Sequence, residues 1–123
     1  MSTPKIFESE YRFCKILWKN EPIRSGQLAK LCEEQLGWKK TTTFTVIKRL
    51  CERGVIANEN MMVRALVKED EAQTAEVEEM LDTRFDGSCM AFLTAFTRSE
   101  KLSKDEMEKL RKMIDSMDTR NEN

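Results

Sequence analysis

The chain of 123 residues contains no histidine and no long apolar run, and both absences exclude classes of protein. Without histidine there is no imidazole to serve as a general base. No stretch approaches the roughly 18 apolar residues that a membrane-spanning helix needs. The first residues also lack the basic-then-apolar pattern of a secretory signal. We therefore predict a cytoplasmic protein without membrane insertion, in which thiols stay reduced.

The cysteines are few and lie far apart in the sequence: Cys14, Cys32, Cys51 and Cys89. Each lies three or four residues from apolar side chains on its own expected helix, which is typical of a buried free thiol rather than a metal ligand. No cysteine has a visible activating partner, and carboxylate pairs such as Glu78-Glu79 are expected on a solvated helix face. We predict no enzyme activity, no cofactor and no metal. A ligand or redox sensor acting through the cysteines remains an alternative.

The net charge of −1 conceals a division between the two halves of the chain. Residues 1–68 contain 13 Lys and Arg against 7 Asp and Glu, whereas residues 69–123 contain 8 against 15. A basic first half and an acidic second half indicate that only the first is suited to a polyanion.

Residues 38–56 carry the strongest functional signal. Residues suited to a buried helix face recur there at the i, i+3, i+4 and i+7 spacing: Thr43, Val46, Ile47 and Leu50. The opposite face carries threonines and basic residues, which can donate hydrogen bonds to base edges and phosphates when a helix lies in a major groove. We therefore predict a DNA recognition helix that stops at Gly54.

The DNA-binding candidates divide by the group they would contact. Those for base edges are Thr41, Thr42, Thr45 and Lys48. Those for phosphates are Lys39, Lys40, Arg49 and, beyond the helix, Arg64. A charged helix face is often merely solvated, but three consecutive threonines have poor helix propensity on an exposed face, which favours a DNA contact. We expect Trp18 and Trp38 to pack in the core, and Phe44 either to pack or to touch a thymine methyl group.

The flanking residues predict a winged helix-turn-helix and a mainly α-helical chain. The expected elements are helices at 8–19 and 25–36, the recognition helix, and strands at 55–57 and 62–67 joined by a turn at 58–61. The expected inner face of the first helix is Tyr11, Cys14, Leu17 and Trp18. Ser9 and Ser25 are the predicted N-caps, and Gly37 follows the end of the second helix. Residues 1–68 are thus the predicted DNA-binding domain.

Residues 69–123 predict helices with narrow apolar stripes. An acidic helix at 69–83 is followed by a break at Asp86-Gly87-Ser88 and a helix from Cys89. Ser103 and Glu106 form a capping-box pair before the last helix, and residues 118–123 are expected to fray. Such stripes cannot enclose a core in one copy, so a helical homodimer is predicted. The predicted dimerisation residues are Val77, Met80, Leu81, Phe92, Leu93, Phe96, Leu110 and Ile114.

Several motifs taken in order resemble the penicillinase-repressor family. They are Ser9-Glu10-Tyr11, Leu17-Trp18, Trp38, TVIKRL at 45–50, RGVI at 53–56, FDGS at 85–88 and LSKDE at 102–106. The resemblance implies a dimeric winged-helix repressor that binds double-stranded operator DNA and controls antibiotic-resistance or stress genes. It also implies release after cleavage by a membrane-bound sensor metallopeptidase.

The chain departs from the family pattern in three places. The family's cleaved Asn-Phe bond corresponds to Ala95-Phe96, which keeps only the phenylalanine. The Cys-x-Cys motifs of copper-responsive members are absent, and Ala65-Leu66 replaces an aromatic residue that many members carry in the wing.

The alternative function is a winged-helix protein-interaction module without specific DNA binding.

Overall fold

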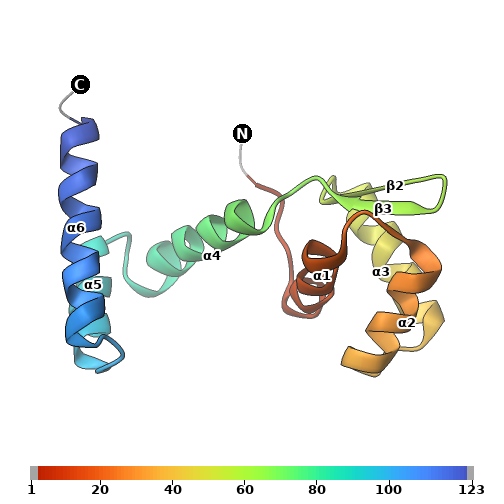
Figure 1. Ribbon diagram of the computed structural model, residues 1–123, viewed down its shortest axis with the longest axis horizontal. Coiled ribbons are helices and arrows are strands. Elements are labelled where there is room, and N and C mark those ends of the chain that lie inside the picture. Colours follow the sequence, from red (N-terminus) through yellow and green to blue (C-terminus); the bar gives the residue numbers. More distant parts are fainter. Residues whose placement is uncertain (1–2, 122–123) are drawn as a thin grey trace. The chain divides into compact units, whose positions relative to one another are not determined.

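A computed structural model describes residues 3–121, with side chains as far as Met117 (Figure 1). Its elements are α1 (Glu8–Asn20), β1 (Ile23–Arg24), α2 (Ser25–Leu36), α3 (Lys40–Glu52), β2 (Ile56–Glu59), β3 (Met62–Ala65), α4 (Glu69–Arg84), α5 (Cys89–Arg98) and α6 (Lys104–Asn121). Three helices and a small antiparallel sheet give the predicted winged helix, and the predicted mainly α-helical class is confirmed.

The chain forms two compact units, Met1–Val77 and Glu78–Asn123. The division lies within α4 and later than the boundary predicted after Lys68. Ala72, near the start of α4, is buried in the core of the N-terminal unit. The first turns of α4 therefore belong to the N-terminal unit.

The core of the N-terminal unit collects one face from each of its first three helices and the inner side of its sheet. Phe13, Leu17, Leu28, Leu50 and Val63 are fully buried there. The whole stripe predicted for α3 is buried, as expected. The prediction for α1 was incomplete, because Phe13 and Ile16 are buried while Tyr11 and Trp18 only pack at the edge of the core.

The sheet has the strand order β1-β3-β2, with both pairs antiparallel. β1 was not predicted, because two residues between Pro22 and a helix have no detectable alternation. β2 starts and ends later than expected, and β3 ends at Ala65. The backbone amides of Leu66 and Val67 instead both donate to the carbonyl of Val55. The chain thus leaves the sheet earlier than the apolar pattern suggested.

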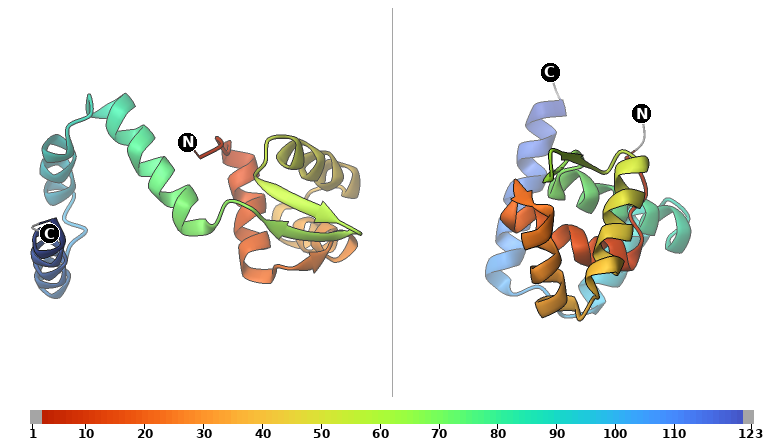
Figure 2. Two further views of the ribbon diagram at one scale, coloured as in Figure 1. Left: turned by 90° about the horizontal axis from the view of Figure 1, so that it is seen from above. Right: turned by 90° about the vertical axis from the view of Figure 1, so that its right-hand side faces the viewer.

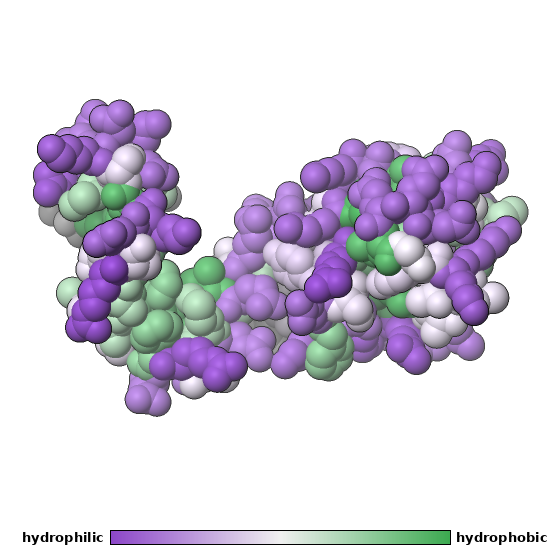
Figure 3. Space-filling view, turned by 90° about the horizontal axis from the view of Figure 1, so that it is seen from below, coloured by the Kyte–Doolittle hydropathy of each residue, from purple (hydrophilic) through white to green (hydrophobic). Residues whose placement is uncertain are grey.

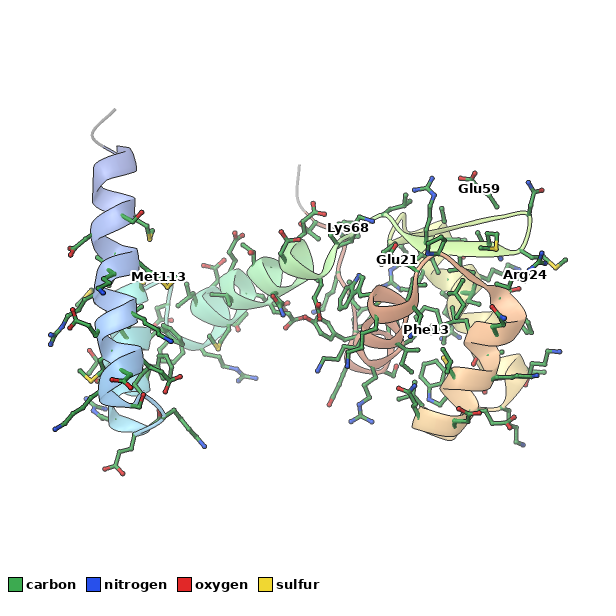
Figure 4. All side chains as sticks on the ribbon, viewed as in Figure 1. Phe13, Glu21, Arg24, Glu59, Lys68 and Met113 are labelled. Atoms are coloured by element: carbon green, nitrogen blue, oxygen red, sulfur yellow. The ribbon has the colours of Figure 1, made fainter. Side chains whose placement is uncertain are left out.

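Trp18 and Glu21 fasten the end of β3 and the residues that follow it to the end of α1. The indole Nε1 of Trp18 donates to the carbonyl oxygen of Val67 at 3.0 Å. Glu21, just past α1, accepts from the amide of Ala65 at 2.8 Å and lies 3.5 Å from Lys68 Nζ (Figure 4). These bonds hold the wing against the helical core.

Both serine N-cap predictions were wrong by a short distance. α1 follows Phe7 rather than Ser9, and the Glu10 carboxylate accepts from the Phe7 amide at 3.0 Å. α2 starts at Ser25 itself, with Arg24 in the cap position and no side-chain cap bond. Gly37, at φ 71°, ends α2 as predicted, since a left-handed residue suits glycine.

The C-terminal unit has helices but no buried side chain among those described from Glu78 to Met117. Ser103 and Glu106 form the predicted capping box, each side chain bonding the other's backbone amide at 3.1 Å. α6 continues to Asn121, so residues 118–121, which were predicted to fray, are helical. Residues 122–123 lie outside the described part. No helix within residues 3–121 is both long and apolar enough to cross a membrane.

Candidate nucleic-acid interface

The outer face of α3 combines hydroxyl and basic groups. The predicted candidates on and just before this helix are all exposed: Lys39, Lys40, Thr41, Thr42, Thr45, Lys48 and Arg49. Burial of Thr43, Val46, Ile47 and Leu50 on the other side fixes this orientation. α3 has no acidic residue before Glu52. The face is therefore positive along nearly the whole helix and carries no carboxylate that would repel a phosphate.

Arg53 fastens the end of α3 to the start of α1. Its guanidinium pairs with both carboxylate oxygens of Glu10, at 2.8 and 2.7 Å, and donates to the Lys5 carbonyl at 2.6 Å. The same group lies over the Phe7 ring, 5.3 Å from its centroid. The hydrogen bonds from Arg53 hold the pKa of the buried Glu10 carboxyl below its usual value, against the effect of burial. Arg53 thus orients α3 rather than facing a ligand.

Trp38 fixes the opposite end of α3. Its ring stacks on Phe13 with centroids 6.2 Å apart and planes 6° from parallel. Trp18 packs edge-on against Tyr11 and is also partly buried. The prediction that both tryptophans pack is confirmed.

Phe44 lies at the surface of α3 rather than in the core. Phe44 is 37% exposed, and the Lys40 ammonium lies 5.7 Å from the centroid of its ring. Next along the helix, the Thr45 hydroxyl donates to the carbonyl of Thr41 at 2.9 Å. The exposed face of α3 therefore includes one aromatic ring among its hydroxyl and basic groups.

The wing presents less free charge than the sequence indicated. Arg64, the predicted wing contact, is exposed but pairs with Glu59 across the hairpin at 3.1 Å. Sequence reasoning did not identify Arg24, which the structure places in β1 beside Met62 of β3. A strand of two residues leaves no periodic signal from which to find it.

The four thiols differ in their exposure to solvent. Burial raises the pKa of Cys14 to about 12, and burial also raises the pKa values of Cys32 and Cys51. Cys89 is exposed at the start of α5. Within the described residues, no group of three or more Cys, Asp or Glu side chains could hold a metal ion.

Apolar side chains gather on the surface of the C-terminal unit, where Figure 3 shows continuous hydrophobic colouring. Among the predicted dimerisation residues, Ile114 is exposed, and so is Val77, the last residue of the N-terminal unit. The others are partly buried: Met80, Leu81, Phe92, Leu93, Phe96 and Leu110. Phe92 contacts both Phe85 and Phe96, with centroids 5.7 Å apart in each pair. The Ala95-Phe96 bond lies inside α5.

This chain matches the penicillinase repressor family over residues 6–116 and belongs to that family. It is 25% identical over 116 residues to the methicillin resistance regulatory protein MecI of Staphylococcus aureus strain Mu50, covering 91% of this chain and 94% of the relative. It is 24% identical over 117 residues to the penicillinase repressor of Bacillus licheniformis, covering 91% of both. Family membership confirms the predicted class, a transcriptional repressor rather than an enzyme.

Proposed function

We propose that this protein is a homodimeric repressor that reads operator DNA by placing α3 in the major groove. The observation that carries the proposal is the outer face of α3, where threonines and cations are exposed and no carboxylate precedes Glu52. A major groove admits an α-helix, and short hydroxyl side chains let the helix approach base edges closely. The chain as a whole has a net charge of −1, so a helix face that met only solvent would have no reason to lack acidic side chains.

The roles follow from where each group sits on the helix. Thr41, Thr42, Thr45 and Lys48 contact base edges, whereas Lys39, Lys40, Arg49 and the wing residue Arg64 contact phosphates. Lys39 and Lys40 lie at the start of α3, where the partial positive charge of the helix end also favours a phosphate. The pair with Glu59 reduces what Arg64 contributes, since part of its charge is already offset.

The dimer is formed by the C-terminal unit. Its described side chains include none that is buried, and Met90, Met113 and Met117 are among its most exposed apolar groups. A contiguous apolar surface of this kind usually marks a protein interface. A two-fold symmetric dimer would place the two α3 helices in half-sites about 34 Å apart on a symmetric operator.

The names of the relatives support control of an antibiotic-resistance gene. The repressor acts in the cytoplasm. It is released from DNA when a membrane-bound sensor metallopeptidase cleaves it. The bond predicted for cleavage lies within the helical backbone of α5. A peptidase requires an extended segment, so α5 must open locally before cleavage of Ala95-Phe96.

A footprint of the purified protein on the DNA upstream of its own gene, repeated across a salt series, tests the function. We expect protection of a two-fold symmetric site that persists at salt concentrations where random DNA is released, because base contacts are less salt-dependent than phosphate contacts. Binding that fades equally on all sequences would contradict operator recognition. No binding at any salt would favour the protein-interaction module instead.

Substitutions separate the two kinds of contact. Lys48→Ala and Thr45→Ala should reduce the preference for the operator over random DNA by roughly tenfold each, as expected for base contacts. Lys39→Ala should weaken both DNAs equally and lower the salt slope by about one per protomer. Lys15→Ala, which removes an exposed lysine from α1, is the matched control and should leave the operator preference unchanged.

A further inference from the structure

The segment that joins the sheet to α4 is tied to the end of α3. The amide of Val55, which follows α3, donates to the Leu50 carbonyl of that helix at 2.9 Å. The Val55 carbonyl accepts in turn from the amides of Leu66 at 2.9 Å and Val67 at 3.0 Å. Val55 and Val67 are both buried. The residues just before α4 are therefore held in place by the end of α3.

The same segment is tied to the end of α1, which it crosses between β3 and α4 in the left view of Figure 2. The indole of Trp18 donates to the Val67 carbonyl, and the Glu21 carboxylate accepts from the Ala65 amide at 2.8 Å. Glu21 also pairs with Lys68, and its side chain is only 19% exposed. Hydrogen bonds to an ionised group in such a setting are stronger than neutral ones. Together these residues form the α4 anchor: Trp18, Glu21, Ala65, Val67 and Lys68.

Lys68 connects the α4 anchor to the first turns of α4. Its carbonyl accepts from the amide of Ala72 at 3.0 Å, and Ala72 is buried in the core of the N-terminal unit. Burial, together with the nearby carboxylates of Glu69 and Glu76, raises the pKa of Tyr11 on α1. The first two turns of α4 thus pack beside α1. Their direction is fixed relative to both α1 and α3.

The length of α4 magnifies any change of direction at its start. It is one helix of 16 residues, Glu69–Arg84, and the C-terminal unit with the proposed dimer interface follows along the chain. At a rise of about 1.5 Å per residue the helix is about 24 Å long, so a rotation of about 10° at its start moves its far end by about 4 Å. One base pair of DNA rises about 3.4 Å. A small rotation at the anchor therefore corresponds to about one base pair.

We propose that the α4 anchor, and Glu21 in particular, sets the spacing between operator half-sites at which the dimer binds. The inference rests on the proposed function and gives a positioning role to residues outside the DNA-reading face. Half-site separation follows from the geometry between the two reading helices of a dimer. In each protomer the anchor fixes one part of that geometry, the angle between α3 and the first turns of α4. Loss of the Glu21 carboxylate frees Ala65 and Lys68 while the outer face of α3 stays intact.

The test uses the full-length protein and the symmetric site that it protects, in duplexes with one base pair inserted or removed between the half-sites. For the unchanged protein, such a change should weaken binding by at least about tenfold, because it shifts and rotates one half-site relative to the other. In Glu21→Ala this penalty should shrink by roughly tenfold, the effect of one hydrogen bond to a charged group. Fluorescence anisotropy with labelled duplexes measures the affinities.

Further variants separate the contacts within the anchor. Trp18→Phe removes the indole N–H but keeps an aromatic ring, and it should also reduce the spacing penalty. Glu21→Gln keeps an acceptor for the Ala65 amide and should retain more of the penalty than Glu21→Ala. The matched control is Glu34→Ala, which removes the same charge from an exposed position of α2 and should leave the spacing penalty unchanged.

Binding to a duplex with a single half-site separates positioning from folding. This affinity should be the same in the unchanged protein, Glu21→Ala and Trp18→Phe, because the DNA-reading face is the same. A spacing penalty that stays unchanged in both variants would overturn the inference and leave the proposed function standing. An equal loss of affinity for the single half-site and for every spacing would also overturn it, since the anchor would then only stabilise the fold. Absence of any symmetric site protected by the unchanged protein would overturn the proposed function as well.

Discussion

In the N-terminal unit the side chains of Phe13, Leu17 and Leu28 are fully buried, whereas in the C-terminal unit no described side chain is buried and Met90 is 70% exposed. Both units are built from helices with apolar stripes. In the first unit, the stripes of α1, α2 and α3 face one another and the inner side of the sheet. In the second, the apolar groups remain accessible to solvent.

The difference shows what helical periodicity can predict. It indicates which apolar side chains share one face of a helix, but not whether a single copy of the chain can bury that face. The winged helix gains a sheet and a long-range ion pair, which close its core within one chain. The C-terminal unit has no strand among its described residues, so we expect a second copy to bury its surface. The following substitutions test that contrast.

The largest effect is expected from Phe13→Ala in the N-terminal core. Removing a fully buried aromatic side chain that also stacks on Trp38 should lower the free energy of unfolding by about 3–5 kcal/mol. Urea unfolding followed by tryptophan fluorescence measures this loss. The loss should be the same at low and high protein concentration, because the cavity lies within one chain. A strong concentration dependence would mean that the winged helix is not independently stable.

Ile114→Asp should have the next largest effect, on association rather than folding. Ile114 is 46% exposed in one copy, so a charge there costs a single chain little but is expensive inside a dimer interface. We expect the dissociation constant of the dimer to rise about 100-fold, measured by analytical ultracentrifugation. Ser116→Asp adds the same charge at another exposed position of α6 and should leave association unchanged. Equal effects of both variants would place the interface elsewhere.

Glu10→Gln should destabilise the N-terminal unit by about 2 kcal/mol at neutral pH, because it removes the charge-assisted bonds to Arg53. The folded-state pKa of Glu10 lies below its unfolded value near 4.5. Its contribution to stability is therefore present above pH 4.5 and is lost as pH falls through the folded pKa. The difference between the variant and the unchanged protein should shrink in acid. A constant difference from pH 7 to pH 3 would contradict the assigned role.

The smallest effect is expected from Cys89→Ser, at an exposed position of the C-terminal unit. The free energy of unfolding should change by less than about 0.5 kcal/mol. Cys14, by contrast, has a pKa raised to about 12, so in the folded protein it should resist alkylation even at pH 9. Thiol alkylation followed by mass spectrometry would distinguish the two sites. Rapid modification of Cys14 in the folded state would revive the sensor alternative.

The helical frame and the outer face of α3 were predictable, because burial of Val46, Ile47 and Leu50 follows directly from their spacing. What escaped prediction depends on contacts between distant segments. Arg53 and Glu10 are 43 residues apart, and nothing local pairs them. β1 exists only because β3 lies beside it, and the tip contact between Ser25 and Met61 follows from that pairing. The exposure of the predicted DNA-binding residues fits their role, which stays a prediction together with the dimer.

The hydrogen bond inside α3 between Thr45 and Thr41 limits which hydrogen bonds Thr45 can make with another group. The single hydroxyl proton of Thr45 is directed to the Thr41 carbonyl at 2.9 Å. While that bond is kept, Thr45 offers a base edge only its oxygen lone pairs and its methyl group. Bases that donate in the major groove, adenine through N6 and cytosine through N4, then suit this position, and so does the methyl group of thymine. If Thr45 contacts a base as proposed, guanine, which presents two acceptors in the major groove, is disfavoured opposite it.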